Sequence, residues 1–184
     1  MKGIEVITAM KESISEADII VSSNGNISRE VFHRLIQPQV YLRGSMGLPI
    51  SVGLGLALAN PERRVIVVTG DGNFLMGLGS IVTASFYKPT NLKILILDNK
   101  KYFTTGGQQT ASSALDYSRF LESLNCEYKN SKEAIQEDIN QDLSEFLNSK
   151  VFAVLHLRIE ASKEKLVNIP WHPEKITQEF AEKF

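Results

Sequence analysis

The stretch Arg64-Val65-Ile66-Val67-Val68-Thr69-Gly70-Asp71-Gly72-Asn73-Phe74 decides how this chain folds. Its run of β-branched residues is continuous rather than alternating, which is typical of a strand buried on both faces of a parallel sheet. The run ends in an acidic residue between two glycines. Because ligands of such sheets bind at the carboxyl ends of the strands, this end of the stretch predicts a tight phosphate-binding turn.

A second buried strand is expected at residues 92–97, and it ends in Asp98 and Asn99. Two adjacent parallel strands would place Asp71 and Asn99 side by side at their carboxyl ends. Carboxylate and amide oxygens suit a hard divalent cation such as Mg²⁺, which bridges protein groups to phosphate oxygens. A long polar loop, residues 100–110, follows directly, and a loop of this kind is usually functional or disordered.

Strand and helix signals alternate along the rest of the chain. A short apolar strand at residues 19–22 stops near Asn24, and Asn26 or Ser28 can cap the helix that follows. Further helices are expected at 48–59, 73–87, 117–124, 132–147 and 174–184, and further strands at 126–128 and 151–157. This alternation predicts a single α/β domain over residues 1–184, a three-layer sandwich with a mostly parallel central sheet.

Composition narrows the classes of partner. The 184 residues carry a formal net charge of -1, which gives no electrostatic reason to expect nucleic acid or an anionic membrane. Cys126 is the single cysteine, so no disulfide framework or thiolate cluster is expected. The start lacks the apolar core of a signal peptide, and no uncharged apolar run reaches the roughly 20 residues that a spanning helix needs. We therefore expect a soluble, cytoplasmic protein.

A dinucleotide-binding fold is the competing interpretation, because Gly70-x-Gly72 follows a strand and Asp98 ends the next strand. Leu75 occupies the place of the third glycine of that fingerprint. In addition, the carboxylate of Asp71 would repel a pyrophosphate in this turn. A divalent cation reverses that repulsion, so the pattern favours a metal–diphosphate clamp.

The spacing of the two strand ends resembles the diphosphate motif of thiamine-diphosphate enzymes: Gly70-Asp71-Gly72, then 25 residues, then Asp98-Asn99. The resemblance implies that Asp71, the side-chain oxygen of Asn99 and the backbone carbonyl of Lys101 ligate Mg²⁺. Two positions depart from the family pattern. Asp98 stands where many members have a first Asn, and Lys101 stands where many have Gly.

Further cofactor contacts are implied by the same resemblance. Gly44-Ser45-Met46-Gly47 is similar to the segment that grips the aminopyrimidine, with the Gly44 carbonyl as acceptor, the Met46 amide as donor and the Met46 side chain as the wedge that bends the cofactor. Asn24-Gly25-Asn26 falls where relatives contact the diphosphate. The implied cofactor-binding set is Asn24, Gly25, Asn26, Gly44, Ser45, Met46, Gly70, Asp71, Gly72, Asn73, Asn99, Lys101, Tyr102 and Thr104.

The motifs most resemble sulfopyruvate decarboxylase β subunits and the carboxyl-terminal domain of phosphonopyruvate decarboxylases. The match is carried by residues 42–48, 53–57 and 104–108 and by the tail from Ile169. This resemblance implies decarboxylation of a small anionic 2-oxo acid with thiamine diphosphate and Mg²⁺. In this family the activating glutamate lies on a separate pyrimidine-binding domain. We therefore expect no catalytic residue in this chain, an α-type partner chain, and no activity without that partner.

Two other functions stay open at this point. One is the β subunit of a 2-oxoacid:ferredoxin oxidoreductase, and the other is a non-catalytic thiamine-diphosphate-binding module. The histidines at 33, 156 and 172 are scattered along the chain, and each is expected to be a structural or a surface residue. Arg29, Arg43 and Lys100 could attract an anionic substrate, although solvated surface charge is the simpler interpretation of each.

Overall fold

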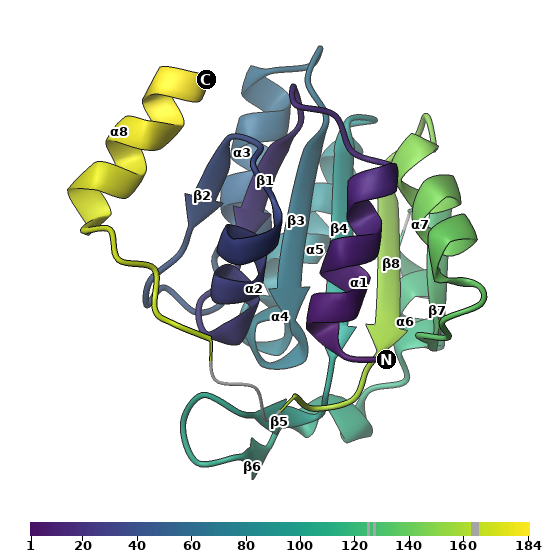
Figure 1. Ribbon diagram of the computed structural model, residues 1–184. Helices are drawn as coiled ribbons and strands as arrows, with labels where there is room; N and C mark the ends of the chain where they lie inside the picture. The colour runs from purple at the N-terminus through teal and green to yellow at the C-terminus, as the bar shows by residue number, and fades with distance from the viewer. Residues whose placement is uncertain (125, 127, 163–165) are drawn as a thin grey trace.

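A six-stranded, all-parallel sheet forms the centre of the computed structural model, which describes residues 1–124, 126, 128–162 and 166–184 (Figure 1). The strand order is β2-β1-β3-β4-β8-β7. A separate antiparallel hairpin, β5-β6, lies beyond the carboxyl ends of the strands. The strands are β1 (Ile19–Ser22), β2 (Gln39–Tyr41), β3 (Val65–Gly70), β4 (Leu92–Asp98), β5 (Lys101–Tyr102), β6 (Gln108–Gln109), β7 (Tyr128–Glu133) and β8 (Ala153–Arg158).

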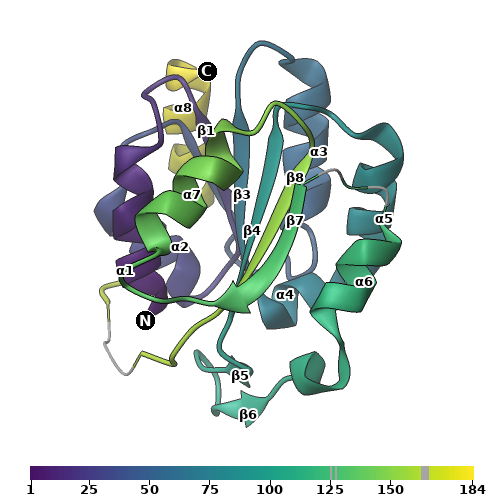
Figure 2. The same ribbon diagram turned by 90° about the vertical axis from the view of Figure 1, so that its right-hand side faces the viewer.

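Helices cover both faces of the sheet (Figure 2). One face carries α1 (Gly3–Ala9), α2 (Asn26–Arg34) and α7 (Ile139–Asn148), and the other carries α3 (Pro49–Ala59), α4 (Asp71–Met76), α5 (Leu78–Tyr87) and α6 (Tyr117–Ser123). The last helix, α8 (Pro173–Lys183), lies beside β2, and the 3₁₀ turns η1 (Met10–Glu12) and η2 (Ala111–Ala114) complete the set. The predicted three-layer α/β class is confirmed.

The central strand explains why its sequence is continuous rather than alternating. Ile66 and Val68 of β3 belong to one hydrophobic core, and Val65 and Val67 belong to the other. All four side chains are fully buried. Both faces of β3 therefore require apolar residues, as the sequence predicts.

The helix predicted over residues 73–87 is wrong in two respects. It starts earlier, at Asp71, and it is interrupted at Gly77 between α4 and α5. A Cβ atom at Gly77 would lie 2.0 Å from the carbonyl oxygen of Gly47. The backbone of the Gly47 turn thus occupies the space that a side chain at the interruption would need.

The helix predicted over residues 132–147 is also wrong at its start. Residues 132 and 133 belong to β7, which pairs with β8 as far as Glu133↔Arg158, and α7 begins only at Ile139. The Nε atom of Arg158 lies 2.7 Å from Glu133 Oε1 and holds this pair across the strands. Cys126 lies outside β7, and position 127 of the strand predicted at 126–128 lies outside the described residues.

The start of α2 differs from the capping prediction. Gly25 is the N-cap residue, with φ +84°, and neither Asn26 nor Ser28 caps the helix. The hydroxyl of Ser28 instead donates to the carbonyl of Gly25 at 3.0 Å. A left-handed backbone favours glycine, so the turn depends on the backbone of Gly25 rather than on a polar cap. In the described part of the chain, no helix is long and apolar enough to cross a membrane.

Candidate functional site

A cavity of about 160 Å³ opens at the carboxyl ends of β1, β3 and β4. All of the predicted cofactor-binding residues line it except Gly44 and Ser45, which are exposed beside it. The loops after three parallel strands therefore converge as the sequence predicts. The lining members are Asn24, Gly25, Asn26, Met46, Gly70, Asp71, Gly72, Asn73, Asn99, Lys101, Tyr102 and Thr104.

Strand register brings the two predicted clamp segments together. Gly70 of β3 pairs with Leu97 of β4, so the residues that follow each strand emerge side by side. Asp71 is the first residue of α4 and is 3 % exposed, whereas Asn99 is partly exposed in the next loop. A buried carboxylate and an amide oxygen thus face the same cavity.

Burial raises the pKa of Asp71 to about 6, although the Thr110 hydroxyl opposes the rise by donating to Asp71 Oδ2. The negative charge of the neighbouring Asp98 adds to the rise. The site is therefore short of positive charge at its buried end. A cation at Asp71 would offset both the burial and the repulsion.

The pKa of Asp98 is shifted in the opposite direction, because several hydrogen-bond donors surround its carboxylate. Burial alone would raise its pKa, but His156, Ser112 and the amide of Lys100 outweigh burial and hold the pKa below its ordinary value. His156 Nε2 lies 3.2 Å from Asp98 Oδ2, and the Lys100 amide donates to Asp98 Oδ1 at 2.9 Å. Two neighbouring carboxyl groups are thus pushed toward different protonation states.

The imidazole of His156 is fixed on three sides. Its Nδ1 lies 2.7 Å from the hydroxyl of Ser131, and its ring stacks on Tyr117 with the centroids 3.7 Å apart. The Ser112 hydroxyl joins Asp98 to Tyr117. This network holds Asp98, and Asp98 in turn holds the amide of Lys100, whose φ is +59°. The strained Lys100 backbone thereby shapes the turn between Asn99 and Lys101.

The Lys101 carbonyl is free of the hairpin ladder. The amide of Thr110 donates to the carbonyl of Lys100, which makes Lys101↔Gln109 a non-hydrogen-bonded pair. The Lys101 amide donates to Asn99 Oδ1 at 2.9 Å, on the side away from β6. The Lys101 carbonyl points to that same side, because the amide and carbonyl of an extended residue leave the strand together.

These donors fit the metal and cofactor that the family resemblance implies. Carboxylate, amide and backbone oxygens form an all-oxygen set, which suits Mg²⁺. The buried hydroxyl of Ser23 also lines the cavity and has no hydrogen-bond partner within the described residues. Because buried polar groups are normally hydrogen-bonded, this hydroxyl is available to a group that enters the cavity. The chemistry of the lining therefore fits a metal-bound diphosphate.

Asn73 joins three of the loops around the cavity. Its Oδ1 accepts from the Gly47 amide at 3.1 Å, and its Nδ2 donates to Asn24 Oδ1 at 2.8 Å. Gly72 beside it has no room for a side chain, because a Cβ atom there would lie 2.4 Å from the ring of Tyr102. One amide side chain and one close contact thus fix the relative positions of these loops.

Residues 44–47, which the family resemblance assigns to the aminopyrimidine, form an internal hydrogen bond in this structure. The Met46 amide donates to the Gly44 carbonyl at 3.0 Å, although the family resemblance assigns both groups to the cofactor. Binding through them would therefore replace a bond of this turn. The Met46 side chain itself lines the cavity.

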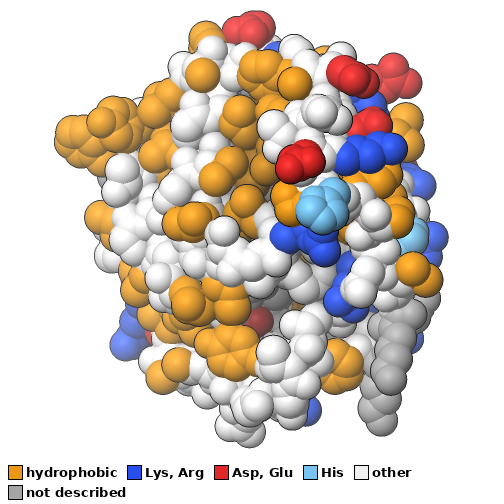
Figure 3. All heavy atoms as spheres, turned by 90° about the vertical axis from the view of Figure 1, so that its left-hand side faces the viewer, with side chains coloured by type: hydrophobic (Ala, Val, Ile, Leu, Met, Phe, Trp, Pro, Cys, Tyr) orange, Lys and Arg blue, Asp and Glu red, His pale blue; other side chains and the backbone are white. Residues whose placement is uncertain are grey.

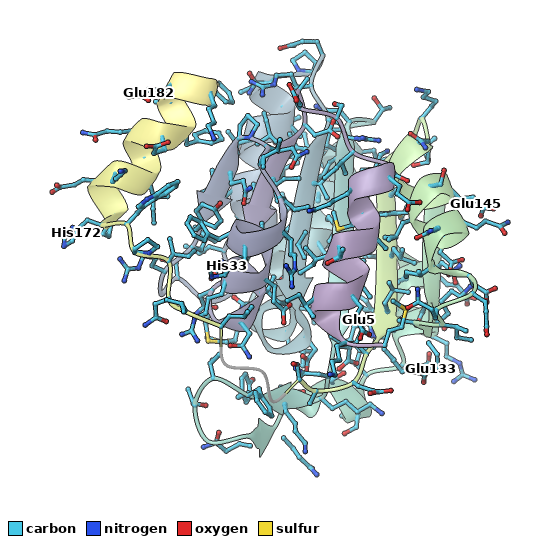
Figure 4. The ribbon with its side chains drawn as sticks, viewed as in Figure 1. Glu5, His33, Glu133, Glu145, His172 and Glu182 are labelled. Atoms are coloured by element: carbon cyan, nitrogen blue, oxygen red, sulfur yellow. The ribbon has the colours of Figure 1, made fainter. Side chains whose placement is uncertain are left out.

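Several site residues were missed by the sequence interpretation. Thr110 and Ser112 lie in the loop after Asn99 at spacings that match no motif, and Ser23 looks like an ordinary end of a strand. His156 had one signal, a polar residue within the apolar run of β8. The other histidines lie elsewhere: His33 on α2 is exposed, and His172 immediately precedes α8 (Figure 4).

Comparison with known proteins assigns the chain to a family. Residues 24–157 match the family model described as "Thiamine pyrophosphate enzyme, C-terminal TPP binding domain". The chain belongs to the thiamine pyrophosphate enzyme family. It is 35 % identical to the sulfopyruvate decarboxylase subunit beta of Methanothermobacter thermautotrophicus, over 98 % of this chain and 92 % of that protein.

Two further similarities bear on the narrower resemblance. The phosphonopyruvate decarboxylase of Streptomyces hygroscopicus is 45 % identical over 60 % of this chain, which corresponds to 28 % of that protein. A 2-oxoglutarate:ferredoxin oxidoreductase from Magnetococcus marinus has a similar structure, with a TM-score of 0.70 and 15 % identity, covering 86 % of this chain and 62 % of that chain. The latter likeness shows the fold alone. The predicted resemblance to the two decarboxylases is confirmed.

Proposed function

We propose that this chain is the β-type subunit of a thiamine-diphosphate-dependent decarboxylase that acts on a 2-oxo acid of the sulfopyruvate or phosphonopyruvate kind. The observation that carries the proposal is Asp71, a buried carboxylate with a raised pKa that shares a cavity with Asn99 and Lys101. Residues 1–184 would form one cofactor-binding domain. The single, buried Cys126 accords with a reducing cytoplasm, which is the compartment we propose.

In this proposal the chain holds and orients the cofactor. Asp71, the Asn99 side chain and the Lys101 carbonyl bind Mg²⁺, and the loop of Asn24 to Asn26 contacts the diphosphate. The Met46 side chain, which lines the cavity, would pack against the cofactor. When bound, thiamine diphosphate supplies the electron sink for loss of CO₂. The protein contributes position and electrostatic support.

The partner in the proposal is an α-type chain with a pyrimidine-binding domain that supplies the activating glutamate. Two observations support a partner. The first relative named above is itself a subunit beta. In addition, residues 44–61 and 72–87 contain no charged residue, and large apolar side chains of α3 and α5 are exposed. Hydrophobic side chains gather on the left of Figure 3, and most charged ones lie toward its right half. Such patches are typical of protein interfaces.

The experiment combines the purified chain with the pyrimidine-binding chain of the same genome. CO₂ release is measured with sulfopyruvate, phosphonopyruvate and pyruvate, in the presence of thiamine diphosphate and Mg²⁺. We expect turnover by the pair and none by either chain alone. Full turnover by the isolated chain would contradict the need for a partner. No turnover by a pair that binds the cofactor would favour a non-catalytic module.

A ferredoxin oxidoreductase subunit is the less favoured function. Its likeness to this chain is one of fold at 15 % identity, whereas the decarboxylase relative matches at 35 % over nearly the whole chain. The same assay separates the two functions. An oxidoreductase would require an electron acceptor for CO₂ release, and the decarboxylase would not.

A further inference from the structure

A second cavity lies directly beside the cofactor cavity. Its volume is about 240 Å³, and it is enclosed by the loops after β1 and β2 and by the segment that precedes α8. Gly25 lines both cavities. A Cβ atom at Gly25 would lie 3.2 Å from the side chain of Thr104, which lines the cofactor cavity, so Gly25 lies between Thr104 on one side and the second cavity on the other.

Two guanidinium groups line this second cavity. Arg29 lies on the first turn of α2 and is half-buried, and Arg43 is exposed in the loop after β2. Among the residues that the structure describes, neither guanidinium forms an ion pair, and the lining contains no Asp or Glu. Concave surfaces with charge of one sign concentrate the field and attract ligands of opposite sign.

One hydrogen bond positions the guanidinium of Arg43. Its Nη1 donates to the carbonyl of Trp171 at 2.9 Å, and within the described residues its other N–H groups form no further hydrogen bond. Asn168 adds an amide from the same tail segment. Guanidinium groups match tetrahedral oxyanions because each presents paired donors in a planar fork. The lining is therefore suited to a small group with three terminal oxygens.

We propose that Arg29 and Arg43 form a subsite for the tetrahedral anionic group, a sulfonate or a phosphonate, at the end of the substrate opposite its 2-oxo acid. This inference rests on the proposed function. The substrate spans the two cavities across Gly25, with its reacting carbon on the cofactor side. Arg29 and Arg43 then select acids that carry the additional charged group over acids that lack it.

Substrate discrimination by the active pair is the first test. The ratio kcat/KM is measured for sulfopyruvate, phosphonopyruvate and pyruvate with Arg29→Gln and Arg43→Gln. We expect each variant to lower kcat/KM about 10- to 100-fold for the two tailed acids, since hydrogen bonds to charged groups have this magnitude. Pyruvate turnover should stay within about 2-fold, because pyruvate has no group for the subsite.

Matched variants control for charge and fold. Arg34→Gln removes an exposed guanidinium from the same helix without touching the cavity, and it should leave all three substrates unaffected. Arg29→Lys should recover part of the loss. The preferred tail, sulfonate or phosphonate, is read from the two tailed substrates. An equal loss for pyruvate, or a loss of thiamine-diphosphate affinity in Arg29→Gln, would overturn the proposal, because the arginine would then serve the cofactor or the fold.

Binding to the isolated chain provides a measurement that needs no turnover. Methanesulfonate and methylphosphonate are titrated while the Nε–H signals of the arginines are followed by NMR. We expect the Arg29 and Arg43 signals to shift and the Arg34 signal to stay. No shift at Arg29 would overturn the subsite. If the pair decarboxylates none of the acids but these shifts occur, the proposed function fails and the anion subsite stands.

Discussion

The two ends of the sheet differ in whether their buried charged groups have partners of opposite charge within the protein. At the amino end, Arg64 precedes β3 and donates to both carboxylate oxygens of Asp18, and also to the carbonyls of Ser13 and Leu147. Asn91, which precedes β4, donates to three backbone carbonyls. Each of these groups meets its complement within the protein.

The carboxyl end lacks that balance. Asp71 has the neighbouring charge of Asp98 and a raised pKa, and the hydroxyl of Ser23 has no partner among the described residues. The Lys101 carbonyl points away from its hairpin. Arg64 and Asn91 therefore stabilise the fold through partners within the protein, whereas Asp71 and Ser23 line a cavity in which a ligand could supply further partners.

The largest expected effect is at the carboxyl end of the sheet. Asp71→Ala should weaken Mg²⁺-dependent binding of thiamine diphosphate by at least about 1000-fold, or about 4 kcal/mol, because it removes the only charged metal ligand of the proposed clamp. Calorimetric titration with and without Mg²⁺ measures this change. Unchanged affinity would mean that the clamp lies elsewhere and that the contrast between the ends is coincidental.

Arg64→Ala should have its effect on stability instead. Removing Arg64 leaves the buried carboxylate of Asp18 unpaired, which should lower the free energy of unfolding by about 3 kcal/mol. Urea denaturation provides the value, and cofactor affinity should not change. Arg63→Ala is the matched control, since the Arg63 guanidinium donates to backbone carbonyls and, among the described residues, pairs with no carboxylate; its loss should cost less than about 1 kcal/mol.

Lys93 makes the stability of the amino end depend on pH. Burial, then the charge of Arg64, lowers the pKa of Lys93 from 10.5 to about 8. Between these values the unfolded chain binds the proton and the folded chain does not, so stability should rise with pH, by about 1–3 kcal/mol. Unfolding measured from pH 8 to 10.5 should show this rise in the natural protein and a smaller one in Lys93→Met. Equal slopes would contradict the assignment.

The smallest effect has opposite signs for stability and binding. Ser23→Ala removes a buried hydroxyl that lacks a partner, so the cofactor-free protein should gain up to about 1 kcal/mol of stability. The same change should weaken cofactor affinity about 5-fold, since the ligand loses one hydrogen bond. Thermal unfolding and titration are compared. Ser22→Ala is the contrasting variant, because the Ser22 hydroxyl already donates to the carbonyl of Val40. A gain in stability in Ser22→Ala would weaken the argument.

The sequence predicted the fold correctly wherever the hydrophobic pattern fitted only one kind of secondary structure. The continuous apolar runs gave β1, β3 and β4, because strands buried on both faces consist mainly of apolar residues. It failed at Gly77 and at residues 132–138. The interruption at Gly77 depends on a turn distant in sequence, and the polar end of β7 has charges that suit either a helix or an edge strand.

The site was predictable only where a short motif encodes it. Asp71 and Asn99 directly follow buried strands, so their place at the carboxyl edge depends on strand order alone. Thr110, Ser112 and His156 reach the same cluster through a long loop and the neighbouring strand β8. Their positions depend on how the loop closes over β4, which no local spacing determines.

The contact between Gly47 and Gly77 limits how this protein can be engineered. Gly47 has φ +85°, and Gly77 lies against its carbonyl. The turn that contains Met46 and the junction of α4 with α5 therefore cannot be exchanged separately. A designer who wished to transplant a different cofactor-gripping turn would have to move residues 44–47 and 71–78 as one cassette. Random mutagenesis would rarely find such paired changes, so recombination between relatives is the more practical route.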